Sequence, residues 1–158
     1  EFMNYYDALS NTVYQGVPSP KNFQTRLGVP LSHDDIVSLL RGESPGGFTG
    51  FLVESMSGDS EDTFMRMRDT VVERVVYSYR HDNIVTFSRT HRLSGATLIQ
   101  ARFANFAVHD NISVPYSAFV MFPSINATFS VQCQTVEVNP KNQKYSFFPP
   151  QEAKRRKL

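Results

Sequence analysis

The chain has 158 residues, of which 41% are hydrophobic and 20% charged, a composition that excludes a disordered polypeptide and suits one folded domain. The net charge of +1 divides unevenly: residues 151–158 hold four basic residues and one acidic residue, and the first 150 hold 12 basic and 14 acidic ones. The body of the chain therefore lacks the basic surface of a nucleic-acid-binding domain, and we expect no nucleic-acid partner. The tail resembles a nuclear-import tract, but a solvated chain end is the simpler interpretation.

Two short aromatic runs open the chain, at residues 2–6 and 12–15, and a turn-rich stretch separates them. This pattern predicts a β-hairpin. Gly16 to Pro20 then interrupts regular structure. A short helical turn is expected over residues 22–27, ending at Gly28.

The segment from Ser32 to Arg41 carries the clearest helix signal. Ser32 suits the N-cap position, and two aspartates follow in the first turn, where the helix dipole favours negative charge. An apolar stripe follows, formed by Ile36, Leu39 and Leu40, and Gly42 is a typical stop signal. We expect a helix of about ten residues that covers part of a sheet.

Most of the remaining sequence alternates in the manner of β-strands separated by turns. The expected strands cover residues 63–69, 71–81, 84–89, 97–109, 116–122 and 125–138. Such regular spacing predicts a mainly β (α+β) fold built on an antiparallel meander. A closed barrel or a sandwich of lipocalin-like size is the alternative architecture.

The last expected strand has the cleanest alternation. Five residues, from Ile125 to Cys133, place apolar side chains on one face, and uncharged polar side chains occupy the other face. Residues 93–139 contain only three charged residues, Arg102, Asp110 and Glu137. We expect this half of the sheet to be covered or to line a cavity.

Catalytic and metal-binding motifs are not found in the sequence. Three His-Asp pairs begin at His33, His81 and His109, but turns and helix caps explain them better than metal ligation or catalysis. Cys133 lies in mid-strand on the apolar face, which favours a core thiol, and as the single cysteine it excludes a disulfide within the chain. We therefore expect a non-enzymatic protein with no catalytic residue, no metal site and no cofactor.

The loop from Glu43 to Phe51 combines three glycines with Phe48 and Phe51. Glycines accept backbone conformations that other residues avoid. We predict that the loop, with Phe48 and Phe51, is a gate at a cavity mouth or a membrane-touching tip. The alternative is the start of a strand with both rings in the core.

The string Leu27-Gly28-Val29-Pro30-Leu31-Ser32, followed by Leu39-Leu40 and Gly42, resembles a segment of an uncharacterised bacterial lipoprotein family related to the LolA/LolB lipoprotein carriers. The aromatic hairpin and the neutral strands also fit that family. The resemblance implies an open half-barrel, a curved antiparallel sheet with one or two short helices on its concave side. It also implies that residues 1–150 form one such domain without its first strands, followed by the basic tail 151–158.

The resemblance further implies a cell-envelope domain at the periplasmic face of the outer membrane, associated with the membrane through a lipid anchor outside this chain. Its partners would be a lipid or an acylated lipoprotein, or another envelope protein. We expect the hydrophobic groove to be lined by Ile36, Leu40, Val120, Phe122, Phe129 and Val131, with core packing as the alternative role for each. The alternative function is a scaffold with a solid core that binds a partner through its sheet edge.

Overall fold

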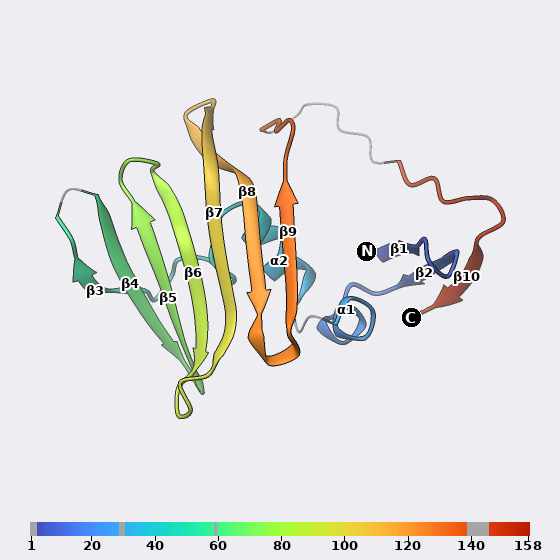
Figure 1. Ribbon diagram of the computed structural model, residues 1–158, viewed down its shortest axis with the longest axis horizontal. Helices are drawn as coiled ribbons and strands as arrows, with labels where there is room; N and C mark the ends of the chain where they lie inside the picture. The colour runs from blue at the N-terminus through green and yellow to red at the C-terminus, as the bar shows by residue number, and fades with distance from the viewer. Residues whose placement is uncertain (1–2, 29–30, 59, 139–145) are drawn as a thin grey trace. The chain divides into compact units, whose positions relative to one another are not determined.

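The computed structural model describes residues 3–28, 31–58, 60–138 and 146–158. The chain divides into two compact units, residues 1–33 with 139–158, and residues 34–138. A three-stranded sheet belongs to the first unit and a seven-stranded sheet to the second, and two short helices accompany them (Figure 1). The expected mainly β class is therefore confirmed.

The first unit contains the predicted hairpin. Strand β1 (Met3–Asp7) pairs antiparallel with β2 (Thr12–Gly16), and the carboxylate of Asp7 accepts hydrogen bonds from the turn that joins them. Strand β10 (Lys154–Lys157) pairs in parallel with β2. The basic tail thus has exposed side chains on a backbone that is held in a sheet.

Both predicted helices are present. Helix α1 (Pro20–Leu27) starts at the N-cap Ser19, whose hydroxyl accepts a hydrogen bond from the Asn22 amide, and it ends at Gly28 with φ +71°. Glycine adopts that left-handed conformation at lower cost than residues that carry a Cβ. Helix α2 covers His33–Leu40 and ends before Gly42, which also has a positive φ.

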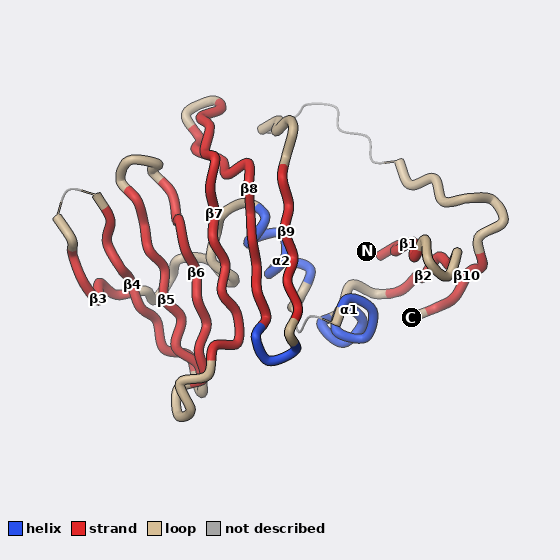
Figure 2. The backbone as a smooth tube through the Cα atoms, viewed as in Figure 1, coloured by secondary structure: helices blue, strands red, loops and turns tan. Residues whose placement is uncertain are grey.

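The second unit is an antiparallel meander in which each strand pairs with its sequence neighbours (Figure 2). Its strands are β3 (Leu52–Met56), β4 (Glu61–Arg68), β5 (Val71–Ser78), β6 (Asn83–His91), β7 (Thr97–His109), β8 (Ile112–Phe122) and β9 (Ala127–Gln132). A 3₁₀ turn over Pro123–Ile125 joins β8 to β9. The described part of the sheet is open, with β3 and β9 as its edges, and it is neither closed nor curled into a barrel. The curved half-barrel that the resemblance implies is therefore not formed by the described strands.

Strand β8 starts earlier than the sequence indicates, at Ile112 and not at Tyr116. Proline inside a sheet removes a ladder hydrogen bond, so Pro115 suggested a boundary. The pairing of β8 with β9 stops near Tyr116, whose carbonyl accepts from the Cys133 amide, and Pro115 pairs only with Phe106 of β7. Pro115 therefore lies where β8 has a single neighbour, and the strand continues through it.

Candidate functional site

One row of apolar residues crosses the whole seven-stranded sheet. Each residue lies directly opposite the next, in the order Val53, Phe64, Val75, Phe87, Ala101, Val120, Phe129. Four members of the row are almost completely buried: Val75, Phe87, Ala101 and Val120. The two residues at the sheet edges, Val53 and Phe129, are 51% and 37% exposed. We call the sheet face that carries this row the apolar face.

Four of the six predicted groove residues meet at the β8–β9 end of the apolar face. Val120 lies opposite Phe129, and Phe122 and Val131 flank this pair on the same face. Val120 and Phe122 are buried, Val131 is half-buried and Phe129 is more exposed. The predicted alternation is correct within β9, but the strand covers only Ala127–Gln132 of the expected residues 125–138, and its apolar side is only partly covered. Ile125 lies in the 3₁₀ turn and Cys133 beyond the strand end, so neither is a mid-strand residue.

The other two predicted groove residues lie on α2. Ile36 and Leu40 are four residues apart and so share one side of the helix, and both are half-buried, whereas Leu39 is fully buried. Figure 1 shows α2 behind strands β7 to β9. The chain leaves α2 at Gly42, where an added Cβ would approach the Pro115 ring of β8 to 2.9 Å.

A buried charge network lies beside the apolar row, on the same face. Glu73 of β5 is opposite both Arg66 of β4 and Arg89 of β6. Its two carboxylate oxygens accept from the Nε atoms of the two arginines, at 2.8 Å in each case. Arg66 is 3% and Glu73 0% exposed. Mutual pairing is what makes burial of such charges tolerable.

Arg66 also holds the loop that follows α2. Its guanidinium donates to the backbone carbonyls of Pro45, Gly47 and Thr49, at 2.8–3.0 Å. The Phe51 ring lies 4.2 Å from the same guanidinium carbon. We call residues 44–51 the strap, because this arginine fixes their backbone across the apolar face.

The two aromatic rings of the predicted gate lie together on the strap. Phe48 stacks on Phe51 at 5.1 Å and meets Phe64 of the apolar row edge-on at 5.2 Å. Phe48 is nevertheless 44% exposed, and Phe51 is half-buried. The strap backbone is thus anchored, while the ring of Phe48 is accessible from solvent.

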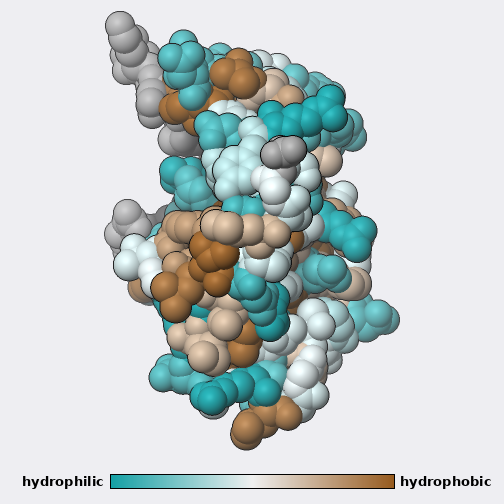
Figure 3. Space-filling view, turned by 90° about the vertical axis from the view of Figure 1, so that its left-hand side faces the viewer, coloured by the Kyte–Doolittle hydropathy of each residue, from teal (hydrophilic) through white to brown (hydrophobic). Residues whose placement is uncertain are grey.

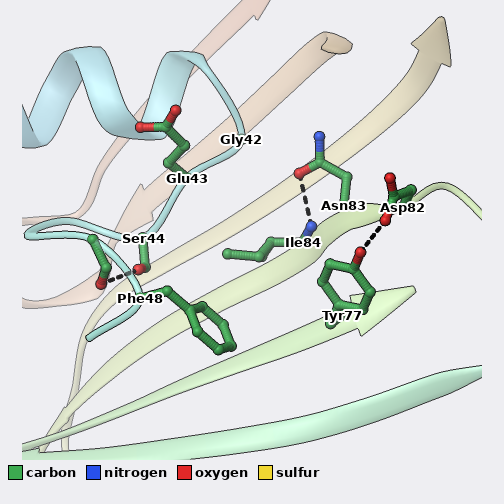
Figure 4. Close-up of a pocket in the computed structure, with 9 residues that line it drawn as sticks. Gly42, Glu43, Ser44, Phe48, Tyr77, Asp82, Asn83 and Ile84 are labelled. Atoms are coloured by element: carbon green, nitrogen blue, oxygen red, sulfur yellow. Dashed lines mark hydrogen bonds between the residues drawn. The ribbon is translucent and has the colours of Figure 1, made fainter. Parts of the chain in front are cut away.

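An open cleft of about 410 Å³ adjoins this ring (Figure 4). The strap side contributes Gly42, Glu43, Ser44, Gly47 and Phe48, and the sheet contributes Tyr77, Asp82, Asn83 and Ile84. In Figure 4 the ring of Phe48 and the side chain of Ile84 lie between the strap and strands β5 and β6. A volume of this size falls within the range of about 300–1,000 Å³ found for small-molecule sites.

One hydrogen bond lies at the polar end of the cleft. The hydroxyl of Tyr77 donates to the carboxylate of Asp82. That hydrogen bond, with desolvation as a smaller cause, raises the pKa of Tyr77 to about 12. Tyr77 and Asp82 are therefore hydrogen-bonded to each other at this end of the cleft.

Histidines and the cysteine have structural surroundings. Nε2 of His109 lies 2.9 Å from the Tyr116 hydroxyl, and the ring of His81 stacks on Phe106 at 4.8 Å. Cys133 is half-buried, next to β9. Among the described residues, no three His, Cys, Asp or Glu side chains are grouped as a metal site would require. No helix in the described part of the chain is long and apolar enough to cross a membrane.

The Arg66–Glu73–Arg89 network and the cleft were not predicted from the sequence. Arg66 lies in the expected strand 63–69, on the same face as Phe64 and Arg68, but nothing in a single strand distinguishes a buried arginine from a solvated one. One feature of the sequence could have indicated the network: Glu73 of the next strand stands among valines. A charged residue in a strand of β-branched residues is buried at low cost only when an opposite charge on a neighbouring strand pairs with it.

Comparisons with known proteins extend the description of the fold. No family model matches the chain, and no curated protein matches it. The crystal structure of a "putative outer membrane lipoprotein-sorting protein domain" from Vibrio parahaemolyticus matches 90% of the chain with a TM-score of 0.55 and 13% sequence identity. This chain spans 66% of that structure. The expected resemblance to lipoprotein-sorting domains is thus confirmed at the level of the fold.

Proposed function

We propose that the chain is a non-enzymatic carrier domain of the bacterial cell envelope, which binds the acyl chain of a lipid or of a lipoprotein on the apolar face. The observation that carries this proposal is the apolar row with its exposed ends at Val53 and Phe129. The fold that the chain shares with a lipoprotein-sorting domain supports it. In this proposal the domain acts at the periplasmic face of the outer membrane, and the open sheet offers its apolar face to the acyl chain.

Acyl binding needs apolar surface and no catalytic group. Each methylene transferred from water to such a surface contributes about 0.8 kcal/mol, so a long chain is held by contact area alone. The proposed lining is Val120, Phe122, Phe129 and Val131 of the sheet, with Ile36 and Leu40 of α2. Phe48 and Phe51 form the gate: Arg66 fixes the strap, and the accessible Phe48 ring moves at the mouth of the cleft.

A matched pair of variants tests the proposal. Val131 lies on the apolar face of β9, and its neighbour Gln132 lies on the opposite face. A triacylated cysteine peptide should bind the wild-type chain, and binding should weaken at least about tenfold in Val131→Asp and stay unchanged in Gln132→Asp. The same peptide without acyl chains should not bind. Equal binding by both variants, or no binding by a folded wild-type chain, would reject acyl carriage.

A second function, a scaffold that binds a partner protein through its sheet edge, is favoured by strand β3. All five of its residues are exposed, including Leu52, Val53 and Met56. Figure 3, which faces the β3 side, shows hydrophobic surface gathered near the middle of the view. In this case a Leu52→Lys/Met56→Lys variant should lose the partner from envelope extracts, and the wild-type chain should not bind the acylated peptide.

A further inference from the structure

Strand β9 is an edge of the seven-stranded sheet. No other strand of this sheet pairs with its outer side, and its pairing with β8 runs from Ala127 to Gln132 without a register shift. The strand Ala-Thr-Phe-Ser-Val-Gln has no charge, no proline and no glycine. Natural sheets usually block such edges with charged residues, prolines or bulges.

The opposite edge differs on two counts. Strand β3 has a register shift between Val53 and Ser55, and Glu54 stands at its centre, where Arg74 pairs with it. Two copies joined antiparallel about the centre of β3 would place two Glu54 side chains opposite each other. Like charges opposite each other in a ladder destabilise the pairing.

The backbone of β9 can accept another strand. The Cys133 amide donates to the Tyr116 carbonyl of β8 at 2.8 Å. Because backbone groups alternate in direction along an antiparallel ladder, Phe129 and Val131 also bond toward β8, and Thr128, Ser130 and Gln132 point their N–H and C=O groups outward. These outward groups are the ones that a second strand would use.

We infer that the outer edge of β9 binds β9 of a second copy of this chain, antiparallel about a two-fold axis at Phe129. In this register Phe129 faces its own counterpart, Val131 faces Ala127, and Thr128 faces Ser130. Apolar side chains therefore meet apolar ones on one face and hydroxyls meet hydroxyls on the other, with no charge opposed to another. Each Thr128–Ser130 pair exchanges two backbone hydrogen bonds, and the two Phe129 residues occupy the non-hydrogen-bonded position, where side chains lie closest.

A second copy suits this edge better than an unrelated peptide does. The register that pairs the outward backbone groups also places apolar side chains opposite apolar ones and hydroxyls opposite hydroxyls. The resulting dimer joins the apolar rows of the two copies end to end at Phe129. The inference does not depend on acyl binding, since the pairing uses backbone groups and side chains of β9 alone.

Single cysteines test the register directly. In a Cys133→Ser background, Phe129→Cys should form an intermolecular disulfide under mild oxidation, since the Cα atoms of such a pair lie about 4.5 Å apart. Thr128→Cys should not, because the two copies of residue 128 would lie beyond the roughly 7 Å that a disulfide spans. Equal cross-linking at both positions, or none at position 129, would overturn the inference.

Sedimentation of the intact chain gives an independent readout. Ser130→Pro removes an outward N–H and leaves the bonds to β8 in place, so it should raise the dimer dissociation constant at least about tenfold. Ser130→Ala keeps that N–H and should dimerise as the wild type does. A wild-type chain that stays monomeric at all concentrations, or a proline variant that dimerises normally, would contradict the proposed interface. Neither result bears on acyl-peptide binding, which is measured separately.

Discussion

Arg66 and Glu73 lie directly opposite each other on strands β4 and β5, and both are buried. All five N–H groups of Arg66 have an acceptor, either the Glu73 carboxylate or a strap carbonyl. This pair links the core of the sheet to the strap, so the stability of the sheet and the position of the proposed gate depend on the same side chain.

Removing the Glu73 carboxylate should strongly destabilise the fold. Glu73→Ala leaves two guanidiniums without their partner, one of them buried, and we expect a loss of about 3–5 kcal/mol in the free energy of unfolding. Glu54→Ala removes the partner of Arg74 at an exposed site and should cost less than about 1 kcal/mol. Urea denaturation of the two variants measures the difference. Similar losses in both would mean that the buried network contributes no more than a surface pair.

Removing N–H donors from residue 66 should make the strap backbone open more often. Arg66→Lys keeps the charge but cannot reach Glu73 and three carbonyls at once. The amides of Gly47 and Phe51, which donate to Ser44 and Phe48 within the strap, should exchange at least about tenfold faster, since one charge-assisted hydrogen bond contributes about 1.5–3 kcal/mol. Arg74→Lys, the control, should leave both exchange rates unchanged. Unaltered protection in Arg66→Lys would show that the strap holds itself.

Truncation of the accessible Phe48 ring tests whether Phe48 acts as a gate or packs in the core. Phe48→Ala should cost less than about 1.5 kcal/mol, because the ring is 44% exposed, and it should change the rate of acyl-peptide uptake. Phe87→Ala, at a fully buried position of the apolar row, should cost about 3–5 kcal/mol. A loss of that larger size in Phe48→Ala, with uptake unchanged, would assign Phe48 to the core.

The contact between Tyr77 and Asp82 predicts a dependence on alkaline pH. The pKa of Tyr77 is raised from 10.0 to about 12 in the folded chain, so the folded state holds this proton more tightly than the unfolded state does. The resulting stability is fully present below pH 10 and is lost as the pH rises through about 12. Ultraviolet titration of the wild type minus that of Tyr77→Phe isolates the group. In Asp82→Asn its pKa should fall toward 10, and an unchanged pKa would assign the shift to another cause.

The sequence predicted elements whose signals are local. The hairpin at Met3–Gly16, the C-cap at Gly28 and the helix after Ser32 depend on residues within a few positions of one another, and all three are present. The alternation in β9 likewise assigned Phe129 and Val131 to one face. These features follow from turn chemistry, capping and strand periodicity.

Features that depend on register could not be derived in this way. Strand alternation assigns a residue to a face but does not say which residue of the next strand lies opposite, so the apolar row and the Arg66–Glu73 pair became visible only in the assembled sheet. Strand β3 was missed because it is short and all its side chains are exposed. Strand β10 was missed because four consecutive basic residues become a strand only through pairing with the distant β2.

The position of a bound acyl chain is the most direct test of the proposed carrier function. A fatty acid with a photoreactive group at its tail, activated in the presence of the chain and mapped by mass spectrometry, reports the residues it touches. We expect labels on Val120, Phe122, Phe129 or Val131 and on α2 at Ile36 or Leu40. Phe119, exposed on the opposite face of β8, serves as the internal control and should stay unlabelled. Labels concentrated at Phe119 and Met67, or spread equally over both faces, would contradict acyl binding on the apolar face.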